Sequence, residues 1–206
     1  NKYIKLDNVE IKNIKNITPY ELKKCVYFIQ DHYLNTIDVV YKPSIKNISS
    51  YFENHNQNYY FSFYKKINYL VDVKNDNIIN SYDIIGMVTS KPIYLHFNNK
   101  NNKKSLNVYY IDYLCVDVNE RKKNIVPELL QTHEYNQRRL NRNINVCLFK
   151  REGHIMFIIP VVLYFAYCYE INSINIVPLK SNYKCIQINK NNNKLLINLL
   201  DKTKNK

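Results

Sequence analysis

Apolar residues recur at helical spacing in two stretches near the start of the chain. In the first, Thr18 suits the N-cap, Pro19 the first helical position and Glu21 the acidic partner of a capping box. The apolar positions that follow are Leu22, Cys25, Val26, Ile29 and Tyr33. A second helix is predicted after Pro43, with Ser44 as its N-cap.

Strand-like apolar runs fill the middle of the chain. The predicted strands cover 58–66, 68–73, 82–97, 106–116 and 144–150. Loops are predicted at 73–81 and 98–105, and a helix that starts at Pro127 separates the last two strands. Gly86 interrupts a strand, where a glycine marks a bulge or a close approach of backbones. This order predicts an α/β fold with a mixed, mostly antiparallel sheet flanked by helices, in a single domain over 1–206.

Two apolar runs remain near the C-terminus, at 155–165 and 194–200. The first is about half as long as a membrane-spanning helix requires, and it contains Pro160. We therefore expect it to join the core and expect no membrane span. Residues 181–206 otherwise form a polar tail.

The net charge of the chain favours anionic binding partners but does not identify one of them. The chain has 30 Lys and Arg against 17 Asp and Glu, a net charge of +13, which favours nucleic acid, a membrane surface or a polyphosphate cofactor. Lys, Asn, Ile and Tyr are abundant and there are only 2 glycines, as in proteins from AT-rich genomes such as those of parasites and large DNA viruses. Codon usage therefore accounts for part of the charge. The 20 tyrosines are spread along the chain, which does not favour base stacking on nucleic acid.

The cysteines and histidines give no sign of a metal centre. The 5 cysteines are odd in number and form no CxxC pair, which predicts reduced thiols and a cytoplasmic protein. The 5 histidines form no HxxxH pair, so no metal is expected. His96 and His133 are interpreted as packing residues rather than bases.

The junction between the predicted strand 106–116 and the helix at Pro127 is where chemistry is expected. A strand that splays from its neighbour leaves backbone N–H groups that can stabilise an oxyanion. A turn into a helix N-terminus offers further N–H groups and the positive end of the helix dipole, which suit a pyrophosphate. Arg121, Lys122 and Lys123 add positive charge at that turn.

The same junction resembles a family signature. The stretch YLCVDVNERKKNIVPELL resembles the N-myristoyltransferase signature F-L-C-V followed by R-S-K-R-V-A-P, with 113–116 and 121–127 on its two parts. A second block, IIGMVTSKPIYLHF, resembles V-G-F-I-S-x-I-P-A-N-I-H-I-Y, with Gly86, Pro92 and His96 near their expected places. Tyr33 falls on the tyrosine of an early N-E-N-Y-V motif. The resemblance covers about residues 18–172.

The resemblance implies a GNAT-type acyltransferase fold and a mechanism. The backbone N–H groups of Tyr113 and Leu114 would polarise the thioester carbonyl of myristoyl-CoA or another acyl-CoA. An amine, such as that of an N-terminal glycine, would attack directly, and Tyr33 would lie on the substrate side. The residues implied in acyl-CoA binding are Tyr113, Leu114, Cys115, Val116, Arg121, Lys122, Lys123, Asn124, Ile125, Val126 and Pro127. Asn124 stands where the family has an arginine, which is expected to weaken a phosphate contact.

The sequence also departs from the family pattern. It ends about where the first of the family's two halves ends, so the peptide-binding half and its C-terminal carboxylate base are expected to be absent or supplied by a partner chain. Asp112 and Glu134 are the nearest carboxylates to the junction and are candidate replacement bases. Strand alternation predicts that Asp112 and Tyr113 face opposite ways. The hypotheses are an N-acyltransferase, a degenerate relative that binds acyl-CoA or a protein without catalysis, and, third, a nucleic-acid-binding module.

Overall fold

The protein is described by a computed structural model. The structure describes residues 2–34, 40–53, 57–72, 77–99, 102–150, 159, 161–163, 165, 167, 170, 178 and 180–204. The chain divides into two compact units, residues 1–159 and 160–206, which are described separately. All five strands belong to the first unit, and whether 1–206 behaves as one domain stays a prediction.

Both N-terminal helices begin at the predicted caps. Helix α1 (Pro19–His32) has the full capping box, because the Thr18 hydroxyl accepts from the Glu21 N–H and Glu21 accepts from the Thr18 N–H. Helix α2 (Ile45–Tyr51) repeats this arrangement with Ser44 and Asn47. Reciprocal bonds of this kind satisfy N–H groups that a helix start leaves unpaired, so these sequences fix where the helices begin.

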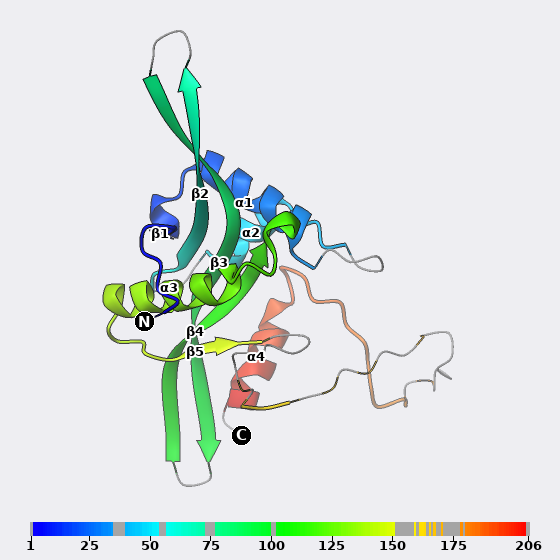
Figure 1. The fold of residues 1–206 in the computed structure, drawn as a ribbon. Helices are drawn as coiled ribbons and strands as arrows, with labels where there is room; N and C mark the ends of the chain where they lie inside the picture. Colours follow the sequence, from blue (N-terminus) through cyan, green and yellow to red (C-terminus); the bar gives the residue numbers. More distant parts are fainter. Residues whose placement is uncertain are drawn as a thin grey trace. The chain divides into compact units, whose positions relative to one another are not determined.

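A five-stranded sheet forms the centre of the first unit (Figure 1). Its strands are β1 (Val9–Asn13), β2 (Tyr60–Asp72), β3 (Asn77–Asn99), β4 (Asn102–Val116) and β5 (Cys147–Phe149). They lie in sequence order, with β1 to β4 antiparallel and β5 parallel to β4. Helix α3 (Ile125–Leu140) makes the crossover, and two short 3-10 helices lie at Ile14–Asn16 and Val118–Glu120. The predicted fold class, a mixed and mostly antiparallel sheet flanked by helices, is confirmed.

Several predicted strand boundaries were wrong: β2, β3 and β4 are longer than their side-chain patterns indicated, whereas β5 is shorter than the predicted 144–150. The predicted strands 58–66 and 68–73 form one strand, β2. Residues 77–81 and 102–105, predicted as loop, belong to β3 and β4. Here β2 pairs with β3 as far as Asp72 and Asn77, so backbone hydrogen bonds define the ribbon without a periodic side-chain pattern. The remaining residues of those two predicted loops, except 98–99 in β3, lie outside the described ones.

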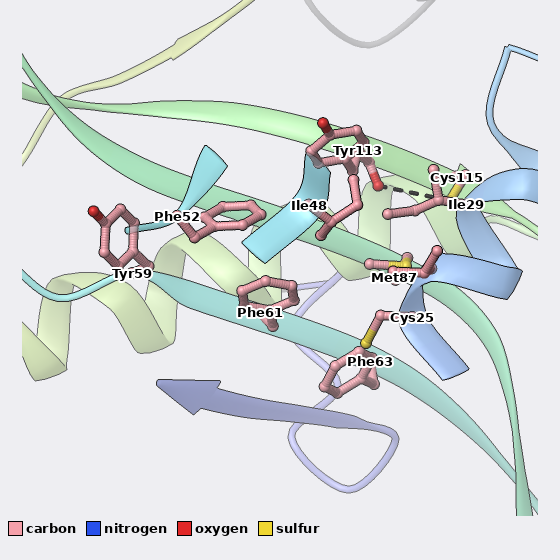
Figure 2. Close-up of a cluster of buried hydrophobic side chains, with 11 residues drawn as sticks. Cys25, Ile29, Ile48, Phe52, Tyr59, Phe61, Phe63, Met87, Tyr113 and Cys115 are labelled. Atoms are coloured by element: carbon pink, nitrogen blue, oxygen red, sulfur yellow. Dashed lines mark hydrogen bonds between the residues drawn. The ribbon is translucent and has the colours of Figure 1, made fainter. Parts of the chain in front are cut away.

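The two faces of the sheet carry separate apolar cores. On one face, α1 and α2 pack Cys25, Val26, Ile29 and Ile48 against Phe61, Phe63 and Met87 (Figure 2). On the other face, α3 places Leu129 against Val9, Val88 and Ile111. Figure 1 shows α3 crossing the face opposite to α1 and α2. The helices therefore hold the strands from both sides, which fixes the position of the β4 strand end relative to both helix layers.

Gly86 lets α3 approach the sheet closely, as its place in a strand predicted. A Cβ atom there would lie 3.2 Å from Ile125 Cγ2, 3.4 Å from Tyr64 Cβ and 3.5 Å from Leu129 Cδ2. The pairing of β2 with β3 also shifts register between Tyr64 and Lys65, beside this glycine. Gly86 thus marks both a bulge and a close contact.

The second unit contains helix α4 (Asn193–Lys204), which includes the apolar segment predicted in the tail. The apolar run 155–165 was predicted to join the core, but its described members are exposed: Ile159, Val161, Val162, Leu163 and Phe165. Their exposed fractions lie between 72% and 99%, so the core prediction is wrong for these positions. The described cysteines are all free thiols, with Cys25 and Cys115 buried and Cys185 exposed.

Candidate functional site

A bulge interrupts β4 at the predicted oxyanion position. Asp112 pairs with Thr89 and Cys115 pairs with Met87, so Tyr113 and Leu114 together stand opposite one residue, Val88. Tyr113 has φ 47°, a left-handed conformation that costs a bulky residue roughly 1–3 kcal/mol. The strain and the extra residue turn the backbone out of the regular ladder at the point where the resemblance places the thioester carbonyl.

The sheet also opens beside this bulge. The parallel pairing of β4 with β5 runs from Tyr109 with Cys147 to Ile111 with Phe149, where β5 ends. Among the described residues, no strand pairs with Asp112 or Tyr113 on that side of β4. A strand end that parts from its neighbour next to a bulge is the geometry expected for exposed backbone donors.

The bulge overturns the prediction that Asp112 and Tyr113 face opposite ways. The Asp112 carboxylate accepts hydrogen bonds from Tyr33 Oη at 3.1 Å and Tyr51 Oη at 2.7 Å. The Tyr113 ring lies 5.3 Å from the Tyr33 ring and 5.5 Å from the Tyr51 ring, centroid to centroid. Both side chains therefore lie on the α1 and α2 face, because the extra residue in β4 reverses the alternation.

A cluster of tyrosines surrounds the Asp112 carboxylate. Tyr33, Tyr51 and Tyr113 are joined by Tyr41, whose hydroxyl lies 3.3 Å from that of Tyr113. Burial, with the Asp112 carboxylate as a further cause, raises the pKa values of the Tyr33 and Tyr51 hydroxyls well above their usual range. Burial likewise raises the pKa of the Tyr113 hydroxyl. These hydroxyls are therefore neutral donors at physiological pH and cannot serve as bases.

One of the two predicted oxyanion donors is already engaged. The Tyr113 N–H donates to Asp112 Oδ1 at 2.8 Å. That N–H can bind an oxyanion only if the carboxylate moves away. Asp112 is thus more than a candidate base, since it also controls the availability of a backbone donor.

The three basic residues of the predicted phosphate turn differ in what they contact. The Arg121 guanidinium donates to backbone carbonyls, from Nε to Val116 O and from Nη2 to His32 O, each at 3.4 Å. Lys123 forms an ion pair with Glu120 at 2.7 Å. Lys122 has φ 66° and is exposed, with no ion pair or hydrogen bond to any described residue. Lys122 is therefore the cation of this turn most available to a phosphate.

The start of α3 offers unpaired backbone donors. Helix α3 begins at Ile125, two residues before the predicted Pro127, and its N-cap Asn124 has φ 61° and makes no side-chain capping bond. Uncapped N–H groups of Ile125 and Val126 at the positive end of the helix dipole suit an anion. Pro127 removes no helical hydrogen bond at this early position. The predicted phosphate turn is thus open and exposed from 121 to 124.

The remaining predicted residues serve as packing. Cys115 is buried in the α1 and α2 core, and burial raises its pKa, which excludes a nucleophilic thiolate. Val116 packs with Ile125 and Ile85, and Leu114 lies against the core beneath α3. The side chains of Cys115, Val116 and Leu114 therefore pack in the cores, and only their backbone groups could contribute to a binding site.

The histidines and the second candidate base lie elsewhere. His133, on α3, is fully buried, with Nδ1 2.8 Å from Ser62 Oγ, and burial lowers its pKa to about 3. His96 is exposed, so its assignment as a packing residue was wrong. Glu134 forms an ion pair with Arg138 on the outer surface of α3. Asp112 is therefore the candidate base that adjoins the bulge.

Sequence reasoning missed Tyr51, Tyr41 and Lys91. The Lys91 ammonium lies 3.4 Å from the centroid of the Tyr51 ring, and burial lowers its pKa. Lys91 and Asp112 lie on neighbouring strands two residues apart in register, which the alternation of β3 and β4 could have indicated once their pairing was known. Tyr51 and Tyr41 come from segments far from β4 in sequence, and no local signal links them to it.

A groove of about 730 Å³ opens between α1 and the strands β2 and β3. Phe28, Phe63 and Ile84 supply apolar lining, whereas Glu21, Asp83 and Glu120 add acidic groups. Its volume is that of a site for a small ligand. Glu120 lines this groove and also holds Lys123, so the groove ends beside the phosphate turn.

No protein-family model matches the chain, and no curated protein matches it in sequence. Among solved structures, N-myristoyltransferase of Saccharomyces cerevisiae with bound myristoyl-CoA is 13% identical, with 70% of this chain and 31% of the yeast chain covered and a TM-score of 0.48. A GNAT family acetyltransferase of Staphylococcus aureus is 13% identical, with 78% of this chain and 99% of that chain covered and a TM-score of 0.46. An aminoglycoside acetyltransferase from an uncultured soil sample, in complex with sisomicin, is 15% identical over 80% and 98% of the two chains, with a TM-score of 0.41. This chain thus spans less than a third of the yeast enzyme's length.

The described residues hold neither a metal-binding group nor a membrane span. No three His, Cys, Asp or Glu side chains among them are arranged to ligate a metal ion. No described helix combines the length and apolar character needed to cross a bilayer.

Proposed function

We propose that this chain binds a long-chain acyl-CoA, with myristoyl-CoA the expected one, and transfers the acyl group to an amine. The observation that carries the proposal is the succession of the Tyr113 bulge, the open phosphate turn and the uncapped start of α3. A bulge can aim backbone donors at a thioester carbonyl, and an uncapped helix start can bind phosphates. Their order along one strand–turn–helix unit suits the two ends of a single acyl-CoA.

The CoA phosphates would lie at the turn 121–124. Lys122 supplies a positive charge that no described residue pairs, and the N–H groups of Ile125 and Val126 supply uncharged donors. Arg121 would act indirectly, because its guanidinium ties the turn to Val116 and to the end of α1. Affinity should therefore depend on Lys122 more than on its two basic neighbours.

The acyl chain would lie in the groove beneath α1. Phe28, Phe63 and Ile84 offer apolar contacts there, although no residue of the Tyr113 bulge is among those that line the groove. Burial of methylene groups contributes about 0.8 kcal/mol each, so a long chain would bind far more tightly than an acetyl group.

The chemical step is a direct transfer. The amine nitrogen attacks the thioester carbonyl carbon, the carbon–sulfur bond breaks, and the CoA thiolate leaves while the amine gives up a proton. Asp112 is the candidate acceptor of that proton, although both of its oxygens accept hydrogen bonds from Tyr33, Tyr51 and the Tyr113 N–H. Release of the Tyr113 N–H would free a donor for the oxyanion. An N-terminal glycine is the proposed amine.

One observation favours a second function. The Asp112 carboxylate already accepts from the Tyr113 N–H, so one of the two proposed oxyanion donors is covered in this structure. A protein that binds acyl-CoA without turnover would not require this N–H to be free. The alternative is therefore a non-catalytic acyl-CoA-binding protein.

Calorimetric binding of a non-hydrolysable myristoyl-CoA analogue, with acetyl-CoA and free CoA as controls, tests the proposal. Saturable binding that requires the long chain is expected. Binding to none of the three ligands would contradict both functions. Release of CoA in the presence of a peptide with an N-terminal glycine then distinguishes transfer from binding alone, because the second function predicts binding without release.

A further inference from the structure

The second unit exposes apolar side chains and has no described core to bury them. On α4, Leu195, Leu196, Leu199 and Leu200 are between 42% and 59% exposed. They stand one, four and five positions apart, so they share one face of the helix. Every described residue of 180–203 is exposed except Asn192. The leucine face of α4, defined by these four residues, therefore has no apolar partner among the described residues of its own unit.

A helix of this length requires a partner to be stable. Helix α4 has 12 residues, and isolated helices shorter than about 12–15 residues are marginal in water. Tertiary packing of the apolar face usually supplies the missing stability. Some apolar phase or surface is therefore expected against the leucine face.

The charges around the face indicate which partner it is. Residues 180–203 contain five lysines, Lys180, Lys184, Lys190, Lys194 and Lys202, against one acid, Asp201. By helical geometry, Lys202 borders the leucine face and Lys194 lies away from it. An apolar face with one lysine at its border and another on the opposite, polar face is typical of a helix that lies on an anionic membrane surface.

We propose that α4 docks the protein on the surface of an anionic lipid bilayer, with its leucine face in the boundary between headgroups and acyl chains. At about 1.5 Å per residue the helix is too short to cross a hydrocarbon core of about 30 Å, so it lies in the plane of the interface. The lysines add attraction to anionic lipids, and leucine burial anchors the contact. None of these α4 residues is assigned to the proposed acyl-CoA site, so the two proposals stand or fall independently.

Co-sedimentation of the full chain with vesicles tests the proposal. We expect the chain to bind vesicles of phosphatidylcholine mixed with an equal amount of phosphatidylserine, and to bind vesicles of phosphatidylcholine alone much less. Because the whole chain carries +13, charge alone could draw it to anionic vesicles. The decisive variant is therefore L196D/L200D, which should lower the partition constant about tenfold or more.

Two controls separate this helix from general charge. L6D/L140D adds the same two acids at exposed leucines of the first unit and should leave much tighter binding than L196D/L200D. K194Q/K202Q should lower the partition constant about tenfold and weaken its salt dependence. Equal effects of L196D/L200D and L6D/L140D would overturn the proposal, because binding would then follow net charge only.

Amide hydrogen exchange of α4 in the unaltered chain gives a readout that needs no variant. Exchange at 193–204 should be fast in solution and slow on anionic vesicles, since the helix gains its partner there. Slow exchange without vesicles in a monomer would mean that the rest of the chain covers the leucine face. Slow exchange together with a dimer that L196D/L200D dissociates would mean that a second copy covers it. Either result overturns membrane docking.

Discussion

The Asp112 carboxylate accepts a hydrogen bond from the backbone N–H of the next residue, Tyr113, at 2.8 Å. Tyr113 itself has a left-handed backbone, with φ 47°. The same oxygen accepts from the Tyr33 hydroxyl, and the other oxygen accepts from Tyr51. One carboxylate thus holds α1, α2 and the β4 bulge together, and it holds the bulge in a form that covers a proposed oxyanion donor.

Replacing Asp112 with asparagine should lower the free energy of unfolding by about 1–3 kcal/mol, because an amide NH₂ group would face a donor and leave it unpaired. Urea unfolding measures the change. The matched control is D83N, an exposed aspartate whose described bond joins Asn68, for which about 0.5 kcal/mol or less is expected. Equal losses for the two variants would mean that the Asp112 cluster contributes little.

Lys122 should matter more for acyl-CoA binding than Lys123. K122Q is expected to weaken binding of a myristoyl-CoA analogue about threefold or more and to reduce its salt dependence, because it removes an unpaired charge at the phosphate turn. K123Q should have a smaller effect, since Lys123 is paired with Glu120. Calorimetry at two salt concentrations checks both, and a larger loss for K123Q would contradict the assigned phosphate position.

Larger side chains at Gly86 should destabilise the protein progressively. G86A places a Cβ atom 3.2 Å from Ile125 Cγ2, so the free energy of unfolding should fall by about 1–3 kcal/mol. G86V should cost more than G86A, because its added methyl groups press further against α3. Chemical denaturation of both variants gives the comparison, and losses that do not grow with side-chain size would show that the contact is not the cause.

The capping box should account for part of the stability of α1. T18A removes the acceptor for the Glu21 N–H and should lower the free energy of unfolding by about 1 kcal/mol. T18S keeps the hydroxyl and should stay close to the unaltered protein. Thermal unfolding followed by circular dichroism measures both, and an equal loss in T18S would assign the effect to the methyl group instead.

Acid should destabilise the first unit through His133. Burial lowers the folded-state pKa of His133 to about 3, below the value of about 6.5 expected in the unfolded chain. The unfolded state therefore binds the proton first, so stability from this group is present above pH 6.5 and is lost as the pH falls toward 3. Denaturant unfolding across that range should show the decline, and H133Q should flatten it. An unchanged pH profile in H133Q would assign the decline to other groups.

The elements that the sequence predicted well are those fixed by local chemistry. At the starts of α1 and α2, the side chains of Thr18, Glu21 and Ser44 bond to backbone groups within three residues. The residue types at these positions therefore indicate where each helix begins. The strand–turn–helix order around Pro127 was likewise readable from apolar and basic runs. Strand ends were not, because β2 and β3 continue as a ribbon held by backbone bonds.

The candidate site was predictable only in part. The turn 121–124 is contiguous in sequence, so its charge and its place before α3 could be predicted. The Asp112 cluster could not, since it joins residues such as Tyr33 and Tyr51 that are 79 and 61 positions away. The conformation of Tyr113 depends on its pairing opposite Val88, which no property of Tyr113 itself indicates.

The extra residue in β4 also changes the parity of the strand. Before it, odd-numbered Ile111 lies beneath α3; after it, odd-numbered Tyr113 and Cys115 lie beneath α1 and α2. A comparison with any relative that lacks the bulge therefore needs a gap of one position within the strand. Without the gap, every position on one side of Tyr113 would be matched to a residue from the wrong layer. The bulge thus marks where the two faces of the strand exchange their odd- and even-numbered positions. A correct sequence alignment of this strand with distant relatives begins by locating it.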